Sequence, residues 1–599
     1  MKPTMEILAR ISKNSLENKE EIFTKLYRYL LRPDIYFTAY KNLYVNKGAA
    51  TKGANDDTAD GFSEAKTAKI IQELADETYQ PTPVRRTYIQ KKNGSKKKRP
   101  LGIPTFTDKL VQEALRMVLE AVYEPIFLPV SHGFRPKRSC HTALKSLKRE
   151  FNGARWFVEG DIKGCFDNID HQVLAGLIHS KIKDVRIIKL IYKFLKAGYL
   201  EDWQYHKTYS GTPQGGIISP LLANIYLHEL DKFVVKLKVE FDTRCKEPIR
   251  TEYRLLSNEI QNLSYHIGRA DGIVKERILA EYRQKRKLML KMPCTAQTSK
   301  CIKYIRYADD FILGVKGSKN DCVWLKEQLS TFIAGTLKME LSADKTLITH
   351  SSQSARFLGY DVRVRRNGII KRGGPNRRTK RTLNNSCELA VPFNDKIHKF
   401  IFANKIAVQK DNGTLFPVHR ASLLRLTDLE IVSAYNAELR GICNYYGLAS
   451  NFYKLCYLAY LMEYSCLKTL ASKHKCTISK VVAMFKDGNG KWGITYETKA
   501  GMKRCYFAKY ADCKGKSDPS DVVCNAAIMY GYSRNALEKR LKAKVCELCG
   551  TTESDCYEVH HVNKLKNLKG KQPWEIVMIA KCRKTLVVCR KCHIAIHNQ

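Results

Sequence analysis

Three aspartates stand where this chain could hold divalent metal ions. Asp309 and Asp310 are adjacent and lie between two short apolar, β-branched runs, residues 301–306 and 311–315, which predicts a tight hairpin with the acids at its tip. Asp161 ends another predicted strand. Hard cations prefer anionic oxygen ligands, and two ions about 3.5–4 Å apart can activate a 3′-hydroxyl and stabilise a leaving pyrophosphate. The three carboxylates therefore indicate two-metal phosphoryl transfer, whereas the adjacent pair alone would also fit an ordinary solvated turn.

A second group of metal ligands lies near the C-terminus. Four cysteines form two Cys-x-x-Cys pairs, which suit a closed tetrahedral zinc site. One adjacent histidine pair precedes the second of these, and another pair, four residues apart, would share one helical face. Four thiolates already complete one zinc, so the histidines are left for a second ion; the alternative is that the whole set binds structural zinc only. The residues are Cys546, Cys549, Cys589 and Cys592, with Glu558, His560, His561, His593 and His597.

Composition points to a polyanionic partner. The 599 residues include 104 Lys+Arg and 59 Asp+Glu, a formal net charge of +45. Such an excess repels itself unless a polyanion neutralises it, so nucleic acid is the leading partner and an anionic membrane surface is the competitor. No apolar run approaches the roughly 20 residues of a bilayer span, and residues 1–23 lack a signal-peptide core. We therefore expect a soluble, cytoplasmic protein without a membrane partner.

The elements that would position these groups can be predicted from periodicity. Asn93-Gly94 lies between strand-like runs and predicts a basic hairpin tip. A helix over 107–125 would be capped by Thr107 or Asp108 and stopped by Pro125. Helical patterns also cover 20–44 and 428–485, a charged helix-patterned insert covers 226–303, and 46–61 is predicted to be a loop.

The densest basic stretch follows the aspartates. Residues 363–381 contain nine Lys or Arg in nineteen, and Gly373-Gly374-Pro375 within them indicates a loop or hairpin tip. A charge run that joins two folded regions favours contact with a nucleic-acid backbone over a disordered tail. Candidate RNA contacts are Arg377, Arg378, Lys380 and Arg381, followed by Arg440, Lys473, His474 and Lys475 in the helical region.

Ordered sequence blocks resemble those of reverse transcriptases. They are Asp161-Ile-Lys-Gly-Cys-Phe-Asp-Asn-Ile, Gly211-Thr-Pro-Gln-Gly-Gly, Tyr307-Ala-Asp-Asp, Leu341-Ser-Ala-Asp-Lys-Thr and Phe357-Leu-Gly-Tyr. Arg99-Pro-Leu-Gly-Ile-Pro and His132-Gly-Phe-Arg-Pro-Lys-Arg-Ser resemble the bacterial group II intron branch, and Leu439-Arg-Gly-Ile-Cys-Asn-Tyr-Tyr resembles the maturase region called domain X. The C-terminal Cys/His set resembles an HNH nuclease. The whole chain thus resembles group II intron-encoded proteins of the reverse transcriptase–maturase–endonuclease kind.

The resemblance implies roles in the polymerase region. The three aspartates would hold Mg²⁺. Phe166 matches the aromatic side chain that walls off a 2′-hydroxyl and so favours dNTPs, and Gln214 would lie beneath the incoming nucleotide. Lys91 and Arg99 would hold its triphosphate. Lys345 would help to anchor the active-site region.

The resemblance also implies roles in the nuclease region. His561 would be the general base that activates water, and Glu558 would support the site by orienting a histidine or the ion. The four cysteines would hold structural Zn²⁺. The chain departs from many HNH sequences because Lys584 and Thr585 stand where an Asn is common. The catalytic ion, Mg²⁺ or another divalent metal, would be held by His560, His593 and His597.

The expected fold is multidomain, α/β and α. It comprises a right-hand reverse transcriptase with fingers and palm, a helical thumb or domain X, and a zinc-stapled ββα-metal HNH domain. The expected ranges are 1–80 for an N-terminal extension, 81–362 for fingers and palm with an insert at 229–300, 363–485 for the basic linker and domain X, 486–540 for a DNA-binding region, and 541–599 for the nuclease.

The implied function is threefold: to bind the intron RNA and assist its splicing, to nick target DNA, and to copy intron RNA into cDNA from the nicked end. The partners would be intron RNA in a ribonucleoprotein, target DNA and dNTPs, and the sequence leaves open whether one copy or a homodimer binds each RNA. Because the RNA supplies the splicing chemistry, splicing should not need the aspartates. The alternatives are a pure RNA-binding splicing factor with inactive enzyme regions, or a reverse transcriptase of another class.

Overall fold

The computed structural model describes residues 2–46, 48–90, 98–212, 215–243, 247–296, 298–367, 369–373, 378–382, 384–498, 501–513 and 536–598. Within these ranges, none of the helices has the length and apolar character that crossing a bilayer requires. Several predicted positions lie outside the described part of the chain: Lys91, the Asn93-Gly94 tip, Gln214, Arg377, and the side chains of Arg378 and Arg381.

A four-stranded antiparallel sheet, the central sheet, forms the middle of the molecule. Its order is β7-β8-β4-β9, so the strand that ends at Asp161 lies beside the hairpin that carries Asp309 and Asp310, as predicted. The strands are β7 (Cys301–Tyr307), β8 (Asp310–Lys316), β4 (Trp156–Asp161) and β9 (Ile348–His350).

Two hydrophobic cores cover the two faces of the central sheet. Along β8, Phe311 and Leu313 belong to the larger core and Ile312 between them belongs to the second, which is the alternation expected of a strand. Helices α8 (Ser219–Phe241) and α11 (Lys319–Gly335) contribute to the larger core, whereas α5 (Cys140–Glu150) contributes to the second. The sheet is thereby fixed between two packed layers.

The larger core also contains the N-terminal helices. Thr105, and neither Thr107 nor Asp108, caps α4, because the Thr105 side chain accepts a hydrogen bond from the Asp108 backbone N–H. The helix predicted within 20–44 begins only at Pro33, after one 3-10 turn. The elements are α1 (Thr4–Glu17), η1 (Tyr27–Tyr29), α2 (Pro33–Tyr44), α3 (Glu64–Ala75), α4 (Phe106–Tyr123), α6 (His171–Lys181), α7 (Val185–Lys196), and a sheet of order β3-β2-β5-β6 from β2 (Val84–Gln90), β3 (Lys98–Ile103), β5 (Tyr199–Glu201) and β6 (Gln204–His206).

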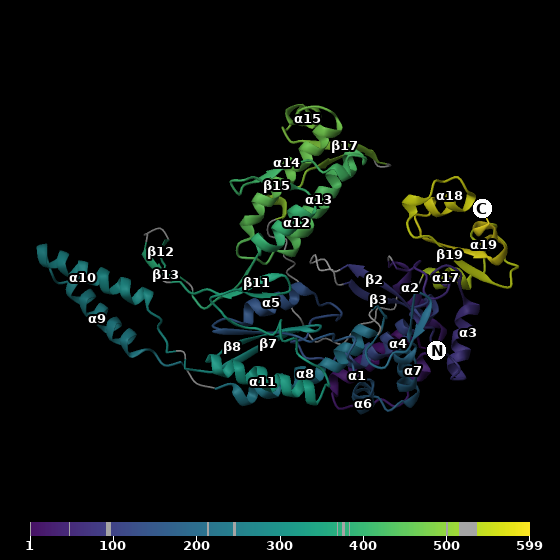
Figure 1. Cartoon of the computed structure of the whole chain (residues 1–599), viewed down its shortest axis with the longest axis horizontal. Coiled ribbons are helices and arrows are strands. Elements are labelled where there is room, and N and C mark those ends of the chain that lie inside the picture. The colour runs from purple at the N-terminus through teal and green to yellow at the C-terminus, as the bar shows by residue number, and fades with distance from the viewer. Residues whose placement is uncertain are drawn as a thin grey trace.

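A helical unit stands above the central sheet and shares the second core with it (Figure 1). Its main helices are α13 (Asp428–Tyr445), α14 (Leu455–Lys473) and α15 (Ile478–Phe485), which confirm the helical pattern predicted there. It also includes α12 (His398–Ala403), the hairpin β15 (Ala407–Gln409) and β16 (Leu415–Pro417), the hairpin β17 (Gly493–Thr498) and β18 (Gly501–Tyr506), and α16 (Tyr510–Cys513). A sheet of β10 (Ala355–Phe357), β11 (Tyr360–Val364) and β14 (Cys387–Ala390) connects it to the centre.

Two hairpins, one helical and one of two strands, project from the same side of the molecule (Figure 1). The charged insert forms an antiparallel helical pair, α9 (Thr251–Ile267) and α10 (Gly272–Lys291), which extends from one end of the molecule (Figure 1). The basic stretch forms the strands β12 (Ile370–Gly373) and β13 (Arg378–Arg381), which pair antiparallel and approach α10. Both hairpins agree with the sequence patterns.

The C-terminal unit lies at the other end, next to α2 and α3 (Figure 1). It contains α17 (Ala536–Lys542), β19 (Tyr557–His561), α18 (Pro573–Ala580), β20 (Thr585–Cys589) and α19 (Arg590–His597). Its sheet has the order β1-β19-β20, and β1 (Phe62–Ser63) comes from the N-terminal region. The larger core runs without interruption from the N-terminal helices into this unit.

Candidate active sites

The first site is built at the end of the central sheet. Asp161 and Asp310 are direct partners in the ladder between β4 and β8, and Asp309 lies in the tight turn that precedes β8. Ala308, in the same turn, has a positive φ of 57°. Lys345 Nζ lies 2.7 Å from Asp161 Oδ2, so the lysine anchors one carboxylate from the side.

Negative charge accumulates at this site. Desolvation by the surrounding protein, together with the charges of Asp309 and Asp161, raises the pKa of Asp310 to about 7, while the charge of Lys345 opposes this rise. Desolvation also raises the pKa of Asp309. Carboxylates that raise one another's pKa favour a cation among them, and an all-oxygen donor set fits Mg²⁺.

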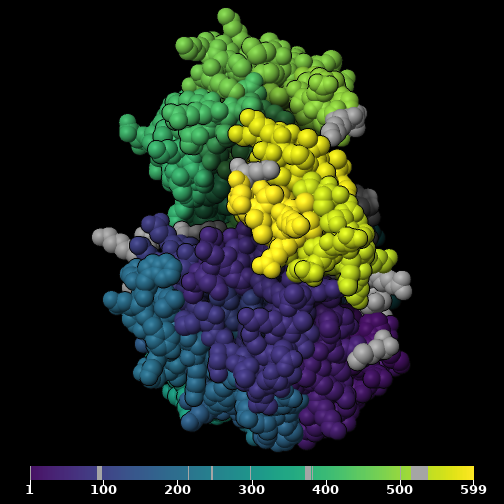
Figure 2. Space-filling view, turned by 90° about the vertical axis from the view of Figure 1, so that its right-hand side faces the viewer, coloured from purple at the N-terminus to yellow at the C-terminus, as the bar shows by residue number. Residues whose placement is uncertain are grey.

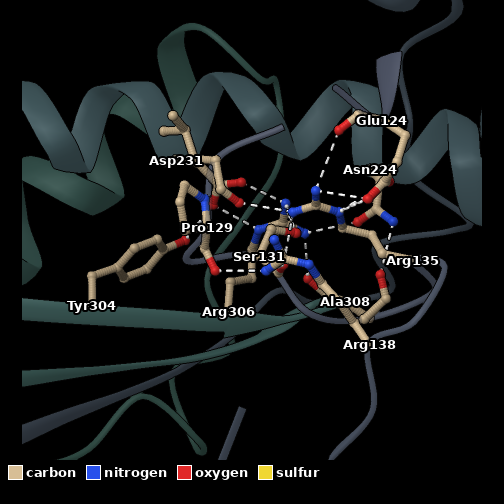
Figure 3. Close-up of polar contacts among 12 residues, drawn as sticks. Glu124, Pro129, Ser131, Arg135, Arg138, Asn224, Asp231, Tyr304, Arg306 and Ala308 are labelled. Carbon is tan, nitrogen blue, oxygen red and sulfur yellow. Dashed lines mark hydrogen bonds and ion pairs between the residues drawn. The ribbon is translucent and has the colours of Figure 1, made fainter. Parts of the chain in front are cut away.

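A buried arginine contacts the turn (Figure 3). Arg306 is 0% exposed, and its Nη2 and Nε atoms lie 2.6 and 2.8 Å from the two carboxylate oxygens of Asp231. Its Nη1 donates to the Ala308 carbonyl at 2.9 Å, inside the turn that carries the aspartates. Asn224 and Ser131 accept its remaining hydrogen bonds at 3.2 and 2.9 Å. The guanidinium therefore ties the turn that carries Asp309 to α8 and to the loop before α5.

A glycine contacts the same turn from outside. A Cβ at Gly133 would lie 2.3 Å from the Ala308 backbone nitrogen and 3.0 Å from the Tyr307 carbonyl carbon. The Gly133 carbonyl accepts a hydrogen bond from Asn224 Nδ2 at 2.9 Å, and the His132 N–H donates to the Arg306 carbonyl at 2.9 Å. Only a residue without a side chain fits between this strand-like segment and the turn.

Phe166 and Arg99 line the approach to the aspartates. Phe166 is half-buried and meets Phe134 edge to face, with 6.1 Å between ring centroids. The backbone carbonyl of Phe166 accepts a hydrogen bond from the Thr212 N–H at 2.7 Å, and Gly211, at a φ of +83°, allows this close approach. Arg99 is exposed on β3, and its charge opposes the desolvation that raises the pKa of Asp309.

The four cysteines converge as a metal site requires. Their Sγ atoms all lie within 4.8 Å of one another, and those of Cys549 and Cys589 are 3.9 Å apart. Burial opposes ionisation of Cys546, yet neighbouring backbone N–H groups lower the pKa of this thiol to about 7. A four-thiolate set of this kind fits zinc.

Three histidines converge beside the cysteines, together with an aspartate that no sequence pattern marked. His560, His593 and His597 each place a ring nitrogen within 4.8 Å of the others and of an Asp60 oxygen. Glu558 Oε2 lies 2.5 Å from His593 Nδ1 and so directs His593 Nε2 into the cluster. His560 is 5% exposed, and among the described residues no group completes a hydrogen bond to either ring nitrogen, although Asp60 Oδ1 lies 3.3 Å from Nδ1.

His561 faces away from the other histidines. Its Nε2 lies 3.2 Å from the backbone carbonyl of Tyr44, at the end of α2, so the proton is on Nε2 and the lone pair is on Nδ1. The side chain is 8% exposed, and burial lowers the pKa of His561. Its Nδ1 is buried and makes no hydrogen bond within the described part of the chain, so this neutral imidazole can accept a proton from water only after the groups around it move.

The candidate RNA contacts divide into two groups. Lys380, Arg440 and Lys475 are exposed. Lys473 Nζ instead lies 2.7 Å from Asp428 Oδ1, and His474 Nε2 lies 3.0 Å from Asp428 Oδ2. The second group therefore helps to close the end of α14 onto the start of α13.

Sequence reasoning missed Asp60, Arg306 and Gly133. A charged residue within the apolar run of β7 was the only available signal for Arg306, and a glycine beside His132 was the signal for Gly133. Asp60 lies in a loop rich in Gly, Ala, Asp and Thr, where an acid is unremarkable.

Three family models match the chain. Residues 89–241 match the reverse transcriptase (RNA-dependent DNA polymerase) model, residues 384–523 match the type II intron maturase model, and residues 546–593 match the AI2M/AI1M-like HNH endonuclease model.

Curated proteins match over nearly the full length. The chain is 68% identical over 594 residues to the Group II intron-encoded protein LtrA of Lactococcus lactis subsp. cremoris, covering 99% of both chains. It is 36% identical over 600 residues to an uncharacterised 91 kDa protein in the cob intron of Schizosaccharomyces pombe, covering 95% of this chain and 69% of that one. It is 31% identical over 612 residues to the putative COX1/OXI3 intron 2 protein of Saccharomyces cerevisiae, covering 99% and 68%.

Proposed function

The chain belongs to the group II intron-encoded proteins, a multifunctional class that serves intron splicing and mobility, and we propose from this premise which residues perform each of its activities. It is an enzyme with a reverse transcriptase domain and an HNH endonuclease domain, joined by a maturase domain.

The central sheet is proposed to be the palm of a right-hand polymerase, with the β2–β3 hairpin in the fingers and α13–α15 as the thumb. Asp161, Asp309 and Asp310 bind Mg²⁺, which neutralises the charge that develops on the transferred phosphoryl group. Phe166 closes the space that a 2′-hydroxyl would need, and Arg99 holds the triphosphate. The convergence of three carboxylates across β4 and β8 is the observation that carries this proposal.

Lys91 and Gln214 are proposed to complete the nucleotide pocket. Both fall outside the described residues, so the resemblance of their sequence blocks is the support for them.

The C-terminal unit is proposed to nick DNA. His561 accepts a proton from the attacking water at Nδ1, and Tyr44 orients its ring through the contact at Nε2. Glu558 orients His593, and His560, His593 and His597 hold a divalent ion that polarises the scissile phosphate. A structural Zn²⁺ ion, bound by Cys546, Cys549, Cys589 and Cys592, stabilises the fold of this unit.

The basic surface is proposed to bind intron RNA as a ribonucleoprotein in the cytoplasm. Lys380, Arg440 and Lys475 are exposed, and the family implies contacts from the basic hairpin, with Arg377, Arg378 and Arg381, and from the end of α14, with Lys473 and His474. One or two copies bind each RNA. The proposed regions are 1–80, 81–362, 363–485, 486–540 for target DNA, and 541–599.

The proposed order begins with splicing of the RNA on the protein. The excised intron then inserts into one strand of target DNA, the nuclease nicks the other strand, and the polymerase extends the new 3′ end with dNTPs along the intron RNA. Because the ribozyme supplies the splicing chemistry, the protein contributes only binding energy to the first step.

Replacing Asp309→Ala and Asp310→Ala together tests the separation of activities. We expect primer extension on an RNA template to be lost, whereas the rate of protein-assisted splicing stays within about twofold, because RNA binding does not use these carboxylates. The matched control is Glu327→Ala, which removes an exposed carboxylate on α11 and should leave both rates unchanged. Polymerisation that survives in the double variant would refute the metal-site assignment, and splicing that disappears with it would refute the separation.

A further inference from the structure

The N-terminal region enters the nuclease site. Asp60 Oδ2 lies 2.7 Å from His597 Nε2 and 3.3 Å from His593 Nε2, and Asp60 Oδ1 lies 3.3 Å from His560 Nδ1. The carboxylate thus contacts all three histidines at once. The C-terminal unit rests directly on the N-terminal region in the space-filling view (Figure 2).

The distances fit a shared ion. Bonds of about 2.0–2.1 Å to a tetrahedral zinc place neighbouring ligand atoms roughly 3.3–3.4 Å apart. Asp60 Oδ1 lies 3.3 Å from His560 Nδ1, and Asp60 Oδ2 lies 3.3 Å from His593 Nε2, so the two oxygens of the carboxylate face different histidines. The separation of His593 Nε2 from His597 Nε2 is also 3.3 Å. The remaining Asp60–His597 separation of 2.7 Å is shorter by about 0.6 Å, the length of a direct hydrogen bond.

Asp60 is held in place from both sides. The backbone N–H of His561 donates to Asp60 Oδ1 at 2.7 Å, and the Gly61 N–H donates to the Val559 carbonyl at 3.0 Å, where β1 joins β19. On the other side, Phe62 is fully buried and stacks on Tyr40 with 4.2 Å between ring centroids. A carboxylate fixed between two packed elements is preorganised for one ligand position.

We propose that Asp60 is the fourth protein ligand of the divalent ion held by His560, His593 and His597, so that one ion joins the N-terminal region to the nuclease and closes its coordination sphere. This inference rests on the proposed nuclease site and adds a ligand from outside the nuclease domain. Three imidazoles and one carboxylate suit Zn²⁺ or a similar first-row ion better than Mg²⁺, which prefers oxygen ligands.

A closed coordination sphere has a functional consequence. Structural zinc sites have four protein ligands, whereas catalytic sites keep a position open for water or substrate. With Asp60 bound, no position remains for the scissile phosphate in a tetrahedral site. The docked nuclease is therefore a resting form, and DNA must displace Asp60 before the second strand can be nicked.

Asp60→Asn separates a ligand from a hydrogen-bond partner. The amide keeps the size of the side chain and can still accept from the His561 N–H, but it is a poor metal ligand. Asp56→Asn is the matched control, because Asp56 lies in the same loop and is exposed, with Lys52 Nζ at 2.7 Å.

The first measurement is zinc affinity of the full-length protein in competition with a chromophoric chelator. We expect two zinc ions per wild-type chain, with the cysteine site as an internal reference that the variant leaves unchanged. In Asp60→Asn the other zinc should bind at least about tenfold more weakly, since even indirect partners of a metal change its affinity by 10–100-fold. An unchanged affinity would overturn the assignment of Asp60 as a ligand.

The second measurement is second-strand nicking by the ribonucleoprotein at saturating divalent ion. We expect Asp60→Asn to nick several-fold faster than the wild type, and amide hydrogen exchange at Gly61 to accelerate as β1 separates from β19. Slower nicking at saturating ion would overturn the resting form, because Asp60 would then belong to the working site.

A combined variant separates this inference from the proposed nuclease function. Asp60→Asn with His561→Ala should lose nicking and keep the weakened zinc affinity of the single variant. Nicking that persists in His561→Ala alone would instead refute the proposed base, and the zinc measurement would still decide the role of Asp60.

Discussion

Gly133→Ala isolates the positioning of the catalytic turn. The added Cβ would lie 2.3 Å from the Ala308 nitrogen, where ordinary contacts begin near 3.4 Å, so the two backbones must separate by roughly 1 Å. The turn cannot yield easily, because Arg306 holds the Ala308 carbonyl and is itself buried against Asp231. Such overpacking costs about 1–3 kcal/mol of stability, and a displacement of about 1 Å of reacting groups costs about 10²-fold in rate.

The assay is single-turnover primer extension on an RNA template by the intact ribonucleoprotein. We expect Gly133→Ala to slow extension by about 100-fold and to leave splicing within about twofold. The matched control is Gly176→Ala in α6, where a Cβ meets nothing within 4 Å and alanine favours the helix by up to about 1 kcal/mol. A folded Gly133→Ala protein that extends primers at half the wild-type rate or more would refute the reasoning.

The two remaining predictions concern metal ions. The pKa of Asp310 is raised to about 7, so the folded state retains a proton that the unfolded chain loses near pH 4, and the stability from that proton is lost as pH rises through 7. Since Mg²⁺ binds the ionised carboxylates, it should raise the melting temperature more at pH 8 than at pH 5.5, and an equal rise at both pH values would contradict this. At the four-cysteine zinc site, Cys549→Ser should release one zinc per chain and abolish nicking, while primer extension stays within about twofold. The control is Cys582→Ser, which replaces an exposed thiol outside the cluster. Nicking by a Cys549→Ser protein that lacks this zinc would disprove a stapling role.

The aspartates of the central sheet could be predicted because local pattern and local structure agree there. Alternation in the runs around Asp309 and Asp310 specifies a hairpin, and the register that brings Asp161 beside Asp310 follows once β4 joins the sheet. The cysteine cluster could be predicted equally well, since two Cys-x-x-Cys pairs in one chain have few roles other than metal binding.

Residues that act through distant partners were beyond the reach of sequence patterns. Arg306 in β7 is explained only by Asp231 on α8, and Asp60 only by histidines some 500 residues later. From the sequence, Lys473 is predicted to be a surface cation that contacts RNA. In the structure it forms an ion pair with Asp428, because the end of α14 lies beside the start of α13. Pairings of this kind depend on tertiary packing, which periodicity does not encode.

The sheet β1-β19-β20 joins strands from the two ends of the chain, so it can form only after β19 has been synthesised. Phe62 pairs with Val559, 497 positions further along the chain, and at about 5–20 residues per second the ribosome takes roughly 25–100 s to cover that distance. During that time β1 has no partner strand, and the surface around Phe62 and Asp60 is open while the polymerase region is already made. The C-terminal unit cannot dock on this edge until β19 has been made, and a chain that stops short of β19 would keep the edge bare.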